Sequence, residues 1–148
     1  MKTIIVLTFL LDQVCKYWVN QNVAEGESRK LLKGKLYITN IKNKGLAMGV
    51  LSEKRCILRI ASALALAYNF HLYIRSEGCE KLGAAFMAGG GLSNIFDRFA
   101  KGEVTDYLYL CPSKKVPVFN LADVFALIGF VTILISGFLK FSDAEKNG

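Results

Sequence analysis

The sequence contains few prolines, cysteines and histidines, and each shortage excludes a class of protein. With 2 prolines and 13 glycines in 148 residues, the chain is neither collagen-like nor proline-rich. Its 4 cysteines are too sparse for a small disulfide scaffold. They form no Cys-x-x-Cys pair, and the single histidine, His71, lies at metal-ligand spacing from none of them. We therefore expect no metal site built on cysteine and histidine.

Acidic residues are also scarce, with 12 Asp and Glu against 19 Lys and Arg, so the formal net charge is +7. Hydrophobic residues make up 53% of the chain, and disordered chains are too poor in apolar residues to match this composition. A length of 148 residues is that of one domain, so residues 1–148 are taken as a single unit. The composition thus leaves a folded, basic and apolar chain.

Four apolar stretches are long enough to cross a lipid bilayer as helices: 3–19, 57–74, 82–99 and 121–141. The fourth has no charged residue between Val124 and Leu139 and therefore no polar face. A soluble bundle, whose helices alternate polar and apolar faces, fits this pattern poorly. A cleavable signal peptide also fits poorly, because Asp12 interrupts the first stretch and no small-x-small cleavage site follows. The sequence predicts an all-α membrane protein with four transmembrane helices.

Two long connections, 20–56 and 100–120, separate these stretches. Alternating residues at 37–39 and 107–110 predict short strands within them. Since the number of spans is even, both connections lie on one side of the membrane, where we expect a small β-rich lobe. They contain most of the basic residues, which the positive-inside bias would place in the cytoplasm, so charge alone leaves the orientation open. For a basic membrane protein we expect contact with membrane phospholipids and no nucleic acid.

Several ionisable residues lie in the predicted spans or at their ends, where an ionisable side chain costs about 2.5–3.5 kcal/mol on insertion scales. They are Asp12, Lys16, Asp97, Arg98, Asp106 and Asp123. The order of the spans places all of them near the face that carries the long connections. Asp12 and Lys16 have the i,i+4 spacing of an ion pair on one helix. A purely structural role is the alternative for this pair, and also for Asp97 and Arg98.

Asp106 and Asp123 lie at the mouths of two spans that one connection joins. Two carboxylates a few ångströms apart do not both ionise easily, and they tend to share a proton. Such a pair can activate water with one carboxyl group and protonate a leaving group with the other. The alternative is that Asp123 is a helix N-terminal residue favoured by the helix dipole and Asp106 is a loop acid.

Two other classes of membrane protein are alternatives to a hydrolase that uses this carboxyl pair. An ion-coupled transporter would spread its acids across the depth of the membrane, whereas here they gather at one face. A scaffold without catalytic activity would have no reason to keep two acids and two asparagines at the mouths of its spans.

Five short runs resemble those of the lipoprotein signal peptidases, the type II bacterial signal peptidases, along nearly the whole chain. The runs are Asp12-x-x-x-Lys16, Asn43-Lys-Gly45-Leu-Ala47, Gly89-Gly-Gly-Leu-Ser93-Asn94-Ile-Phe-Asp97-Arg98, Gly102-Glu-Val104-Thr-Asp106-Tyr107 and Phe119-Asn120-Leu-Ala122-Asp123. Any one run is a weak signal, and all five in order on four spans are highly specific. The resemblance implies a membrane aspartyl endopeptidase that removes signal peptides by cutting prolipoproteins before a diacylglyceryl-modified cysteine.

The resemblance also implies roles for individual residues. The catalytic pair would be Asp106 and Asp123. The supporting or substrate-binding residues would be Asp12, Lys16, Asn43, Gly45, Asn94, Asp97, Arg98, Asn120 and Ala122. No metal or cofactor would be used, and globomycin would inhibit by occupying the site. The enzyme would cross the bacterial cytoplasmic (inner) membrane several times, with its active site on the extracytoplasmic face.

The chain departs from the family pattern at three positions. Ser93 stands where the family usually has glycine, and Leu46 and Met48 stand where alanine and an aromatic residue are more common. We expect these departures to bear on substrate preference and not on the reaction, because both aspartates are intact.

Overall fold

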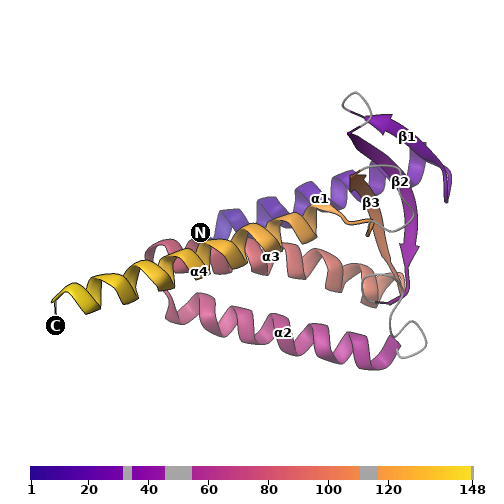
Figure 1. Ribbon diagram of the computed structural model, residues 1–148. Coiled ribbons are helices and arrows are strands. Elements are labelled where there is room, and N and C mark those ends of the chain that lie inside the picture. Colours follow the sequence, from indigo (N-terminus) through magenta and orange to yellow (C-terminus); the bar gives the residue numbers. More distant parts are fainter. Residues whose placement is uncertain (32–34, 46–54, 111–116, 148) are drawn as a thin grey trace.

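The computed structural model describes residues 1–31, 35–45, 55–110 and 117–147 as four helices and a three-stranded sheet. The helices are α1 (Lys2–Asn22), α2 (Arg55–Arg75), α3 (Gly78–Ala100) and α4 (Leu121–Asn147). The strands are β1 (Ser28–Leu31), β2 (Leu36–Asn43) and β3 (Val104–Leu110). The sheet lies across one end of the helices, which we call the sheet end, and both termini point toward the other end (Figure 1).

Each of the four predicted stretches is a helix, but only α2 and α4 are apolar enough along their whole length to qualify as membrane spans by composition. The qualifying segments are Cys56–Arg75 and Leu121–Lys146, with mean hydropathies of 1.3 and 2.2. The four predicted helices are thus confirmed, but by composition only two of them qualify as membrane spans. The reason is that α1 and α3 contain charged residues, and these are turned inward: Asp12, Lys16 and Asp97 are fully buried.

Apolar side chains cover much of the outer surface of the helices. Only 6% of the apolar window of α4 and 11% of that of α2 is buried inside the protein. Large side chains such as Val14, Leu64 and Phe138 are each more than 60% exposed. A soluble bundle would bury such residues, since contiguous apolar surface of this extent marks contact with lipid or another protein. This distribution argues against a soluble bundle.

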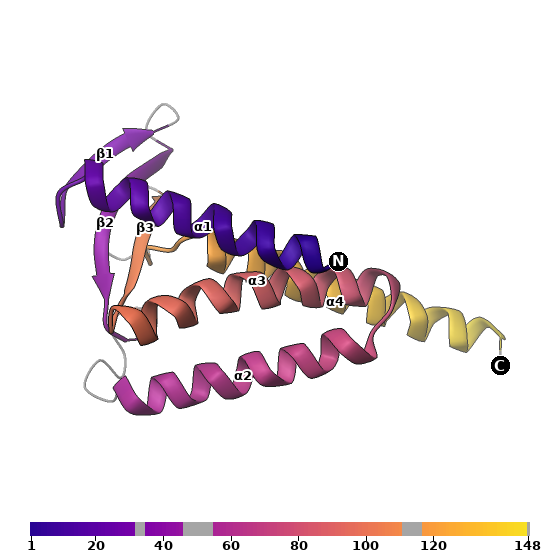
Figure 2. The ribbon, with the colours of Figure 1, turned by 180° about the vertical axis from the view of Figure 1, so that it is seen from behind.

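Helix α3 packs against each of the other three helices, and Figure 2 shows it between α1 and α2. Small residues allow the close approach. A Cβ atom at Gly83 would lie 2.6 Å from the carbonyl oxygen of Gly129 in α4, and one at Gly90 would lie 2.3 Å from that of Ala122. A Cβ at Gly89 would overlap Thr8 of α1. Gly83, Gly89 and Gly90 therefore belong to a small-residue face on which α3 packs closely against α1 and α4.

The sheet is antiparallel, in the order β1-β2-β3, with an irregularity in the β2–β3 register between Ile38 and Ile41. Strands β2 and β3 include the predicted stretches 37–39 and 107–110. Strand β1 was not predicted, because all four of its residues are exposed and it has no apolar alternation. Phe119 forms a bridge with Leu108 of β3, and α4 begins two residues later. This connection brings the first turn of α4 beside β3.

Candidate active site

Polar side chains from five elements meet beneath the sheet, at the sheet end of the bundle. They come from the second half of α1, the last turns of α3, strands β2 and β3, and the start of α4. These segments are far apart in the sequence, and the span order alone predicted that they share one face. The structure brings them into hydrogen-bond contact.

Asp106 lies on β3 and is 4% exposed. Its two carboxylate oxygens accept hydrogen bonds from two side-chain amides, Asn43 Nδ2 at 2.8 Å and Asn120 Nδ2 at 2.7 Å. Burial raises the pKa of Asp106 to about 6, and the charge of Asp123 acts in the same direction. The hydrogen bonds from Asn43 and Asn120 oppose this shift. Asp106 is therefore a carboxyl group that changes its protonation state near neutral pH.

Asp123 lies in the first turn of α4 and is exposed. It accepts a hydrogen bond from Asn94 Nδ2 at 2.9 Å and one from the backbone N–H of Asn120 at 3.1 Å. In return, the Asn120 side-chain oxygen accepts the backbone N–H of Asp123 at 3.0 Å. This reciprocal pair is a capping box, which fixes the start of a helix. Asp123 thus has the N-terminal helix role that was the alternative to catalysis, and its carboxylate also faces the same site as Asp106.

Asp106 and Asp123 line one cavity, which we call the sheet-end cavity, with a volume of about 300 Å³. Asn120 Nδ2 also lies 3.1 Å from Asn94 Oδ1, so the two asparagines connect the two carboxylates. The remaining lining residues are Asn43, Asn94, Arg98, Val104, Pro117, Val118 and Phe119. The cavity lining therefore combines two acids, amide groups and one guanidinium with four apolar residues.

A second group of charges, the ionic cluster, consists of Asp12, Lys16, Asp97 and Lys101. Lys16 Nζ lies 2.7 Å from Asp12 Oδ2 and 2.9 Å from Asp97 Oδ2. Lys101 Nζ lies 2.6 Å from Asp97 Oδ1. The predicted ion pair between Asp12 and Lys16 is confirmed, whereas the role of Lys101 was missed, although its i,i+4 spacing from Asp97 is visible in the sequence.

Lys16 links the ionic cluster to the sheet-end cavity. Its ammonium group donates to Asn94 Oδ1 at 2.9 Å, and Asn94 donates to Asp123. Because an amide oxygen accepts and an amide nitrogen donates, this contact fixes which way the Asn94 side chain points. Lys16 therefore orients a donor toward Asp123 without contacting that carboxylate.

Ser93, one of the departures from the family pattern, belongs to the ionic cluster's surroundings. Its hydroxyl donates to Asp12 Oδ2 at 2.5 Å and accepts from Gln13 Nε2 at 2.8 Å. Ser93 is fully buried and is not among the residues that line the sheet-end cavity. It therefore contacts the ionic cluster and not the space for a substrate. Leu46 and Met48 lie outside the described residues.

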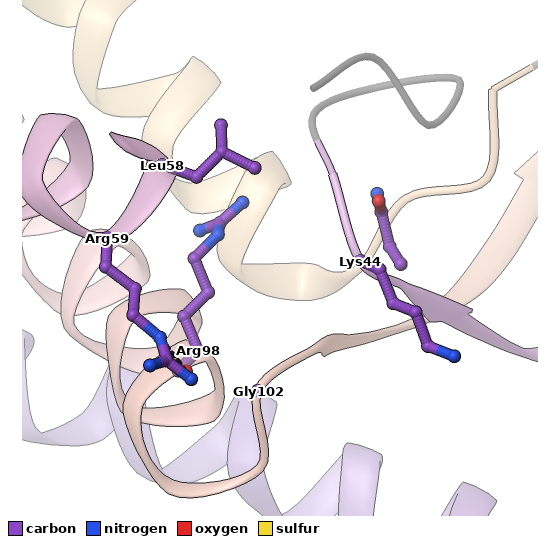
Figure 3. A pocket seen from close by; sticks show the side chains of 6 residues that line it. Lys44, Leu58, Arg59, Arg98 and Gly102 are labelled. Carbon is purple, nitrogen blue, oxygen red and sulfur yellow. Dashed lines mark hydrogen bonds between the residues drawn. The ribbon is translucent and has the colours of Figure 1, made fainter. Parts of the chain in front are cut away.

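Arg98 follows Asp97 on α3 and points to a different side of the helix. It lines the sheet-end cavity and also a smaller cavity beside α2, where its side chain extends toward Leu58 (Figure 3). Arg59 Nε donates to the Arg98 backbone carbonyl at 3.0 Å and fastens α2 to α3. Among the described residues, no carboxylate forms an ion pair with Arg98. Its guanidinium is therefore available to a ligand.

Gly45 and Ala122 contribute through backbone contacts. The Gly45 N–H donates to Asn43 Oδ1 at 3.0 Å, which orients the Asn43 amide nitrogen toward Asp106. Ala122 is fully buried, and its carbonyl lies against Gly90. Within the described ranges, no group of three His, Cys, Asp or Glu side chains is placed to hold a metal ion.

Comparisons with known proteins cover nearly the whole chain. Residues 4–139 match the family described as Signal peptidase (SPase) II. A lipoprotein signal peptidase from Syntrophomonas wolfei subsp. wolfei is 34% identical over 145 residues, which cover 95% of this chain and 94% of that protein. One from Nostoc punctiforme is 38% identical over 143 residues, which cover 90% and 86%. A bacterial membrane enzyme solved by the in meso method at 2.3 Å resolution superposes with a TM-score of 0.87 and 28% identity, covering 95% of this chain and 88% of that chain.

Proposed function

The chain belongs to the signal peptidase II family of aspartic proteases, and on this premise we propose that Asp106 and Asp123 are its catalytic pair. Members of this family remove the signal peptides of prolipoproteins. One observation carries the proposal: the two carboxylates line the same cavity and are connected through Asn94 and Asn120. A peptide bond placed in that cavity meets two acids and several amide donors at once.

The two carboxyl groups divide the acid and base work. One is ionised and takes a proton from a water molecule, which attacks the carbonyl carbon of the scissile peptide. The other is protonated and gives its proton to the leaving amine nitrogen. Asp106 and Asp123 suit this division, because the pKa of about 6 at Asp106 allows the pair to hold a single proton near neutral pH.

The neighbouring side chains hold the substrate and the carboxylates. Asn43, Asn94 and Asn120 donate to the two carboxylates and fix their orientation. Arg98 forms no ion pair with a described residue and donates to substrate carbonyl groups. Asp12, Lys16 and Asp97 hold the ionic cluster that orients Asn94. Gly45 and Ala122 contribute backbone contacts.

The substrate is a prolipoprotein whose cysteine carries a diacylglyceryl group, and cleavage occurs just before that cysteine. The apolar residues of the sheet-end cavity, Val104, Pro117, Val118 and Phe119, suit a substrate that is partly lipid. The cavity is lined by residues of the sheet end, and the helices that lead to it carry exposed apolar side chains. The acyl chains can therefore remain in the bilayer while the peptide reaches the two acids.

All four helices cross the bacterial cytoplasmic (inner) membrane, with the sheet end on the extracytoplasmic face. For α1 and α3, the support is that their charges are buried while side chains such as Leu10, Val14 and Phe96 are exposed. The basic residues of the sheet end then lie at the level of the phospholipid headgroups. Globomycin is expected to inhibit by occupying the sheet-end cavity.

The test is cleavage of a diacylglyceryl-modified prolipoprotein peptide by purified protein in detergent. We expect Asp106→Asn and Asp123→Asn to abolish cleavage while the variants remain folded. Asp143→Asn is the matched control, since it makes the same change at the far end of α4 and should cleave like wild type. Cleavage at the wild-type rate by either active-site variant would refute the catalytic pair and revive the transporter and scaffold alternatives.

A further inference from the structure

Tyr107 follows Asp106 on β3 and points to the opposite side of the strand, as successive strand residues do. Tyr107 is 3% exposed and packs with Val19 of α1, with Val23 just after α1 and with Leu121 of α4. In the sequence it stood out as part of a strand-like alternation and as the last residue of a family-like run, with no role assigned to it. Its position between three elements indicates a role for the hydroxyl group at its tip.

The Tyr107 hydroxyl makes two hydrogen bonds to two different helices. It donates to Asp12 Oδ1 of α1 at 3.0 Å and accepts the backbone N–H of Leu121 in α4 at 3.2 Å. The direction is unambiguous, because the Leu121 amide is only a donor and an ionised Asp12 is only an acceptor. Burial raises the pKa of Tyr107 above its ordinary value, and the charge of Asp12 adds to the shift, so the group remains a hydroxyl.

The Leu121 N–H is one of the backbone donors that a helix start leaves without a partner. The capping box satisfies the N–H of Asp123 and ties it to Asn120, whose side-chain amide donates to Asp106 of β3. These bonds hold the residue before α4, and none of them reaches the N–H of Leu121. The backbone hydrogen bonds between β3 and the segment that leads into α4 end at Phe119. Tyr107 extends the connection past Asn120 and onto the helix itself.

We propose that Tyr107 is a positioning residue, whose hydroxyl couples Asp12 of the ionic cluster to the first turn of α4 and so sets Asp123 relative to Asp106. The inference rests on the proposed function, since it takes these aspartates as the catalytic pair. Asp12 Oδ2 is already held by Lys16 and Ser93, so Tyr107 supplies the donor for Asp12 Oδ1. The strand that carries one catalytic acid thereby anchors the helix that carries the other.

The test is Tyr107→Phe, which removes the hydroxyl and keeps the ring. We expect kcat to fall about tenfold or more with KM within about twofold of wild type, because a small displacement of a reacting group slows chemistry more than it weakens binding. The matched control is Tyr109→Phe on the same strand. Tyr109 stacks on Tyr37 at 5.0 Å, and within the described part of the chain its hydroxyl has no hydrogen-bond partner. This control should keep wild-type kcat and KM.

A second pair of variants tests the same bond from α4. Leu121→Pro removes the N–H at the first helical position, where proline is well tolerated, and Leu121→Ala keeps the N–H while losing the same side chain. We expect Leu121→Pro to lower kcat below that of Leu121→Ala, and to add little further loss in the Tyr107→Phe background. This pair also decides the matter if Tyr107→Phe does not fold.

Wild-type kcat in Tyr107→Phe, or an equal loss of kcat in Tyr107→Phe and Tyr109→Phe, would overturn the inference. A rise in KM with unchanged kcat would overturn it as well, because that pattern indicates a binding role. The failure of the proposed function has a different signature, which is cleavage by Asp106→Asn. If Asp106→Asn is inactive and Tyr107→Phe behaves like wild type, only the positioning role of Tyr107 is wrong.

Discussion

Two neighbouring regions at the sheet end each contain two carboxylates, and they hold them in different ways. In the ionic cluster, Asp12 and Asp97 lie within 2.9 Å of Lys16, and all three side chains are fully buried. In the sheet-end cavity, Asp106 and Asp123 accept hydrogen bonds from amide groups. Neither of them forms an ion pair with any described residue.

Under the proposed function, this difference separates the structural acids from the catalytic pair. An ammonium group stabilises the ionised form of a buried carboxylate by its full charge, so the carboxylate stays ionised. An amide donates a hydrogen bond but brings no net charge, so a buried carboxylate held by amides can still gain or lose a proton. The regions meet at Asn94, which accepts from Lys16 and donates to Asp123. The ionic cluster thus positions the cavity without forming an ion pair with its acids.

The largest effect should come from removing the shared cation of the ionic cluster. Lys16→Met leaves two buried carboxylates short of a counter-charge, and breaking a buried pair in this way costs about 3–5 kcal/mol. The matched change is Lys101→Met, because Lys101 also binds Asp97 but is 40% exposed, and we expect a loss below about 1 kcal/mol. Chemical unfolding in detergent micelles measures both. Equal losses of unfolding free energy in the two variants would show that burial does not make the Lys16 ion pairs more important than that of Lys101.

A smaller effect concerns the pH dependence of stability in the sheet-end cavity. The pKa of Asp106 is raised from 3.8 to about 6, so the folded protein binds a proton here more tightly than the unfolded chain. Its contribution to stability is therefore full below about pH 4 and is lost as the pH rises through about 6. The free energy of unfolding of wild type, minus that of Asp106→Ala, should fall by on the order of 1–3 kcal/mol between pH 4 and 8. If this difference in the free energy of unfolding instead rises with pH, the pKa of Asp106 is not raised in the folded protein.

Much of this architecture follows from the sequence, because an apolar run of bilayer length satisfies its backbone hydrogen bonds in lipid by forming a helix. The predicted stretches 3–19, 57–74, 82–99 and 121–141 all lie within helices, and the order of the spans correctly grouped the polar residues at one end. Strand β1 escaped prediction because its pairing with β2, and not an apolar pattern, defines it.

The finer contacts of the site depend on distances between elements, which local spacing does not give. Ser93, Gln13 and Tyr107 contact the ionic cluster through side chains that come from two helices and a strand. Nothing in the sequence around Tyr107 distinguishes its hydroxyl from that of Tyr109, yet one is bonded on both sides and the other stacks on Tyr37. The sequence also does not show that Asp12 and Asp97 share Lys16, because Asp97 lies 81 positions from Lys16 along the chain.

The smallest effect should come from removing a single amide donor from the sheet-end cavity. Asn43→Ala takes away one of the two hydrogen bonds that lower the pKa of Asp106, so that pKa should rise above about 6, by roughly half a unit to one unit. The pH profile of kcat/KM then shifts upward on one limb only. If Asp106 is the base, the acidic limb moves, and if Asp106 is the acid, the alkaline limb moves.

The matched control for this profile is Asn22→Ala, which removes an amide that donates to the Trp18 carbonyl at the exposed end of α1. Its pH profile should coincide with that of wild type. A downward shift in Asn43→Ala would mean that the amide stabilises the protonated form of Asp106, and the contrast between charge-held and amide-held acids would then fail. An upward shift on either limb supports the contrast and also identifies which aspartate activates the water.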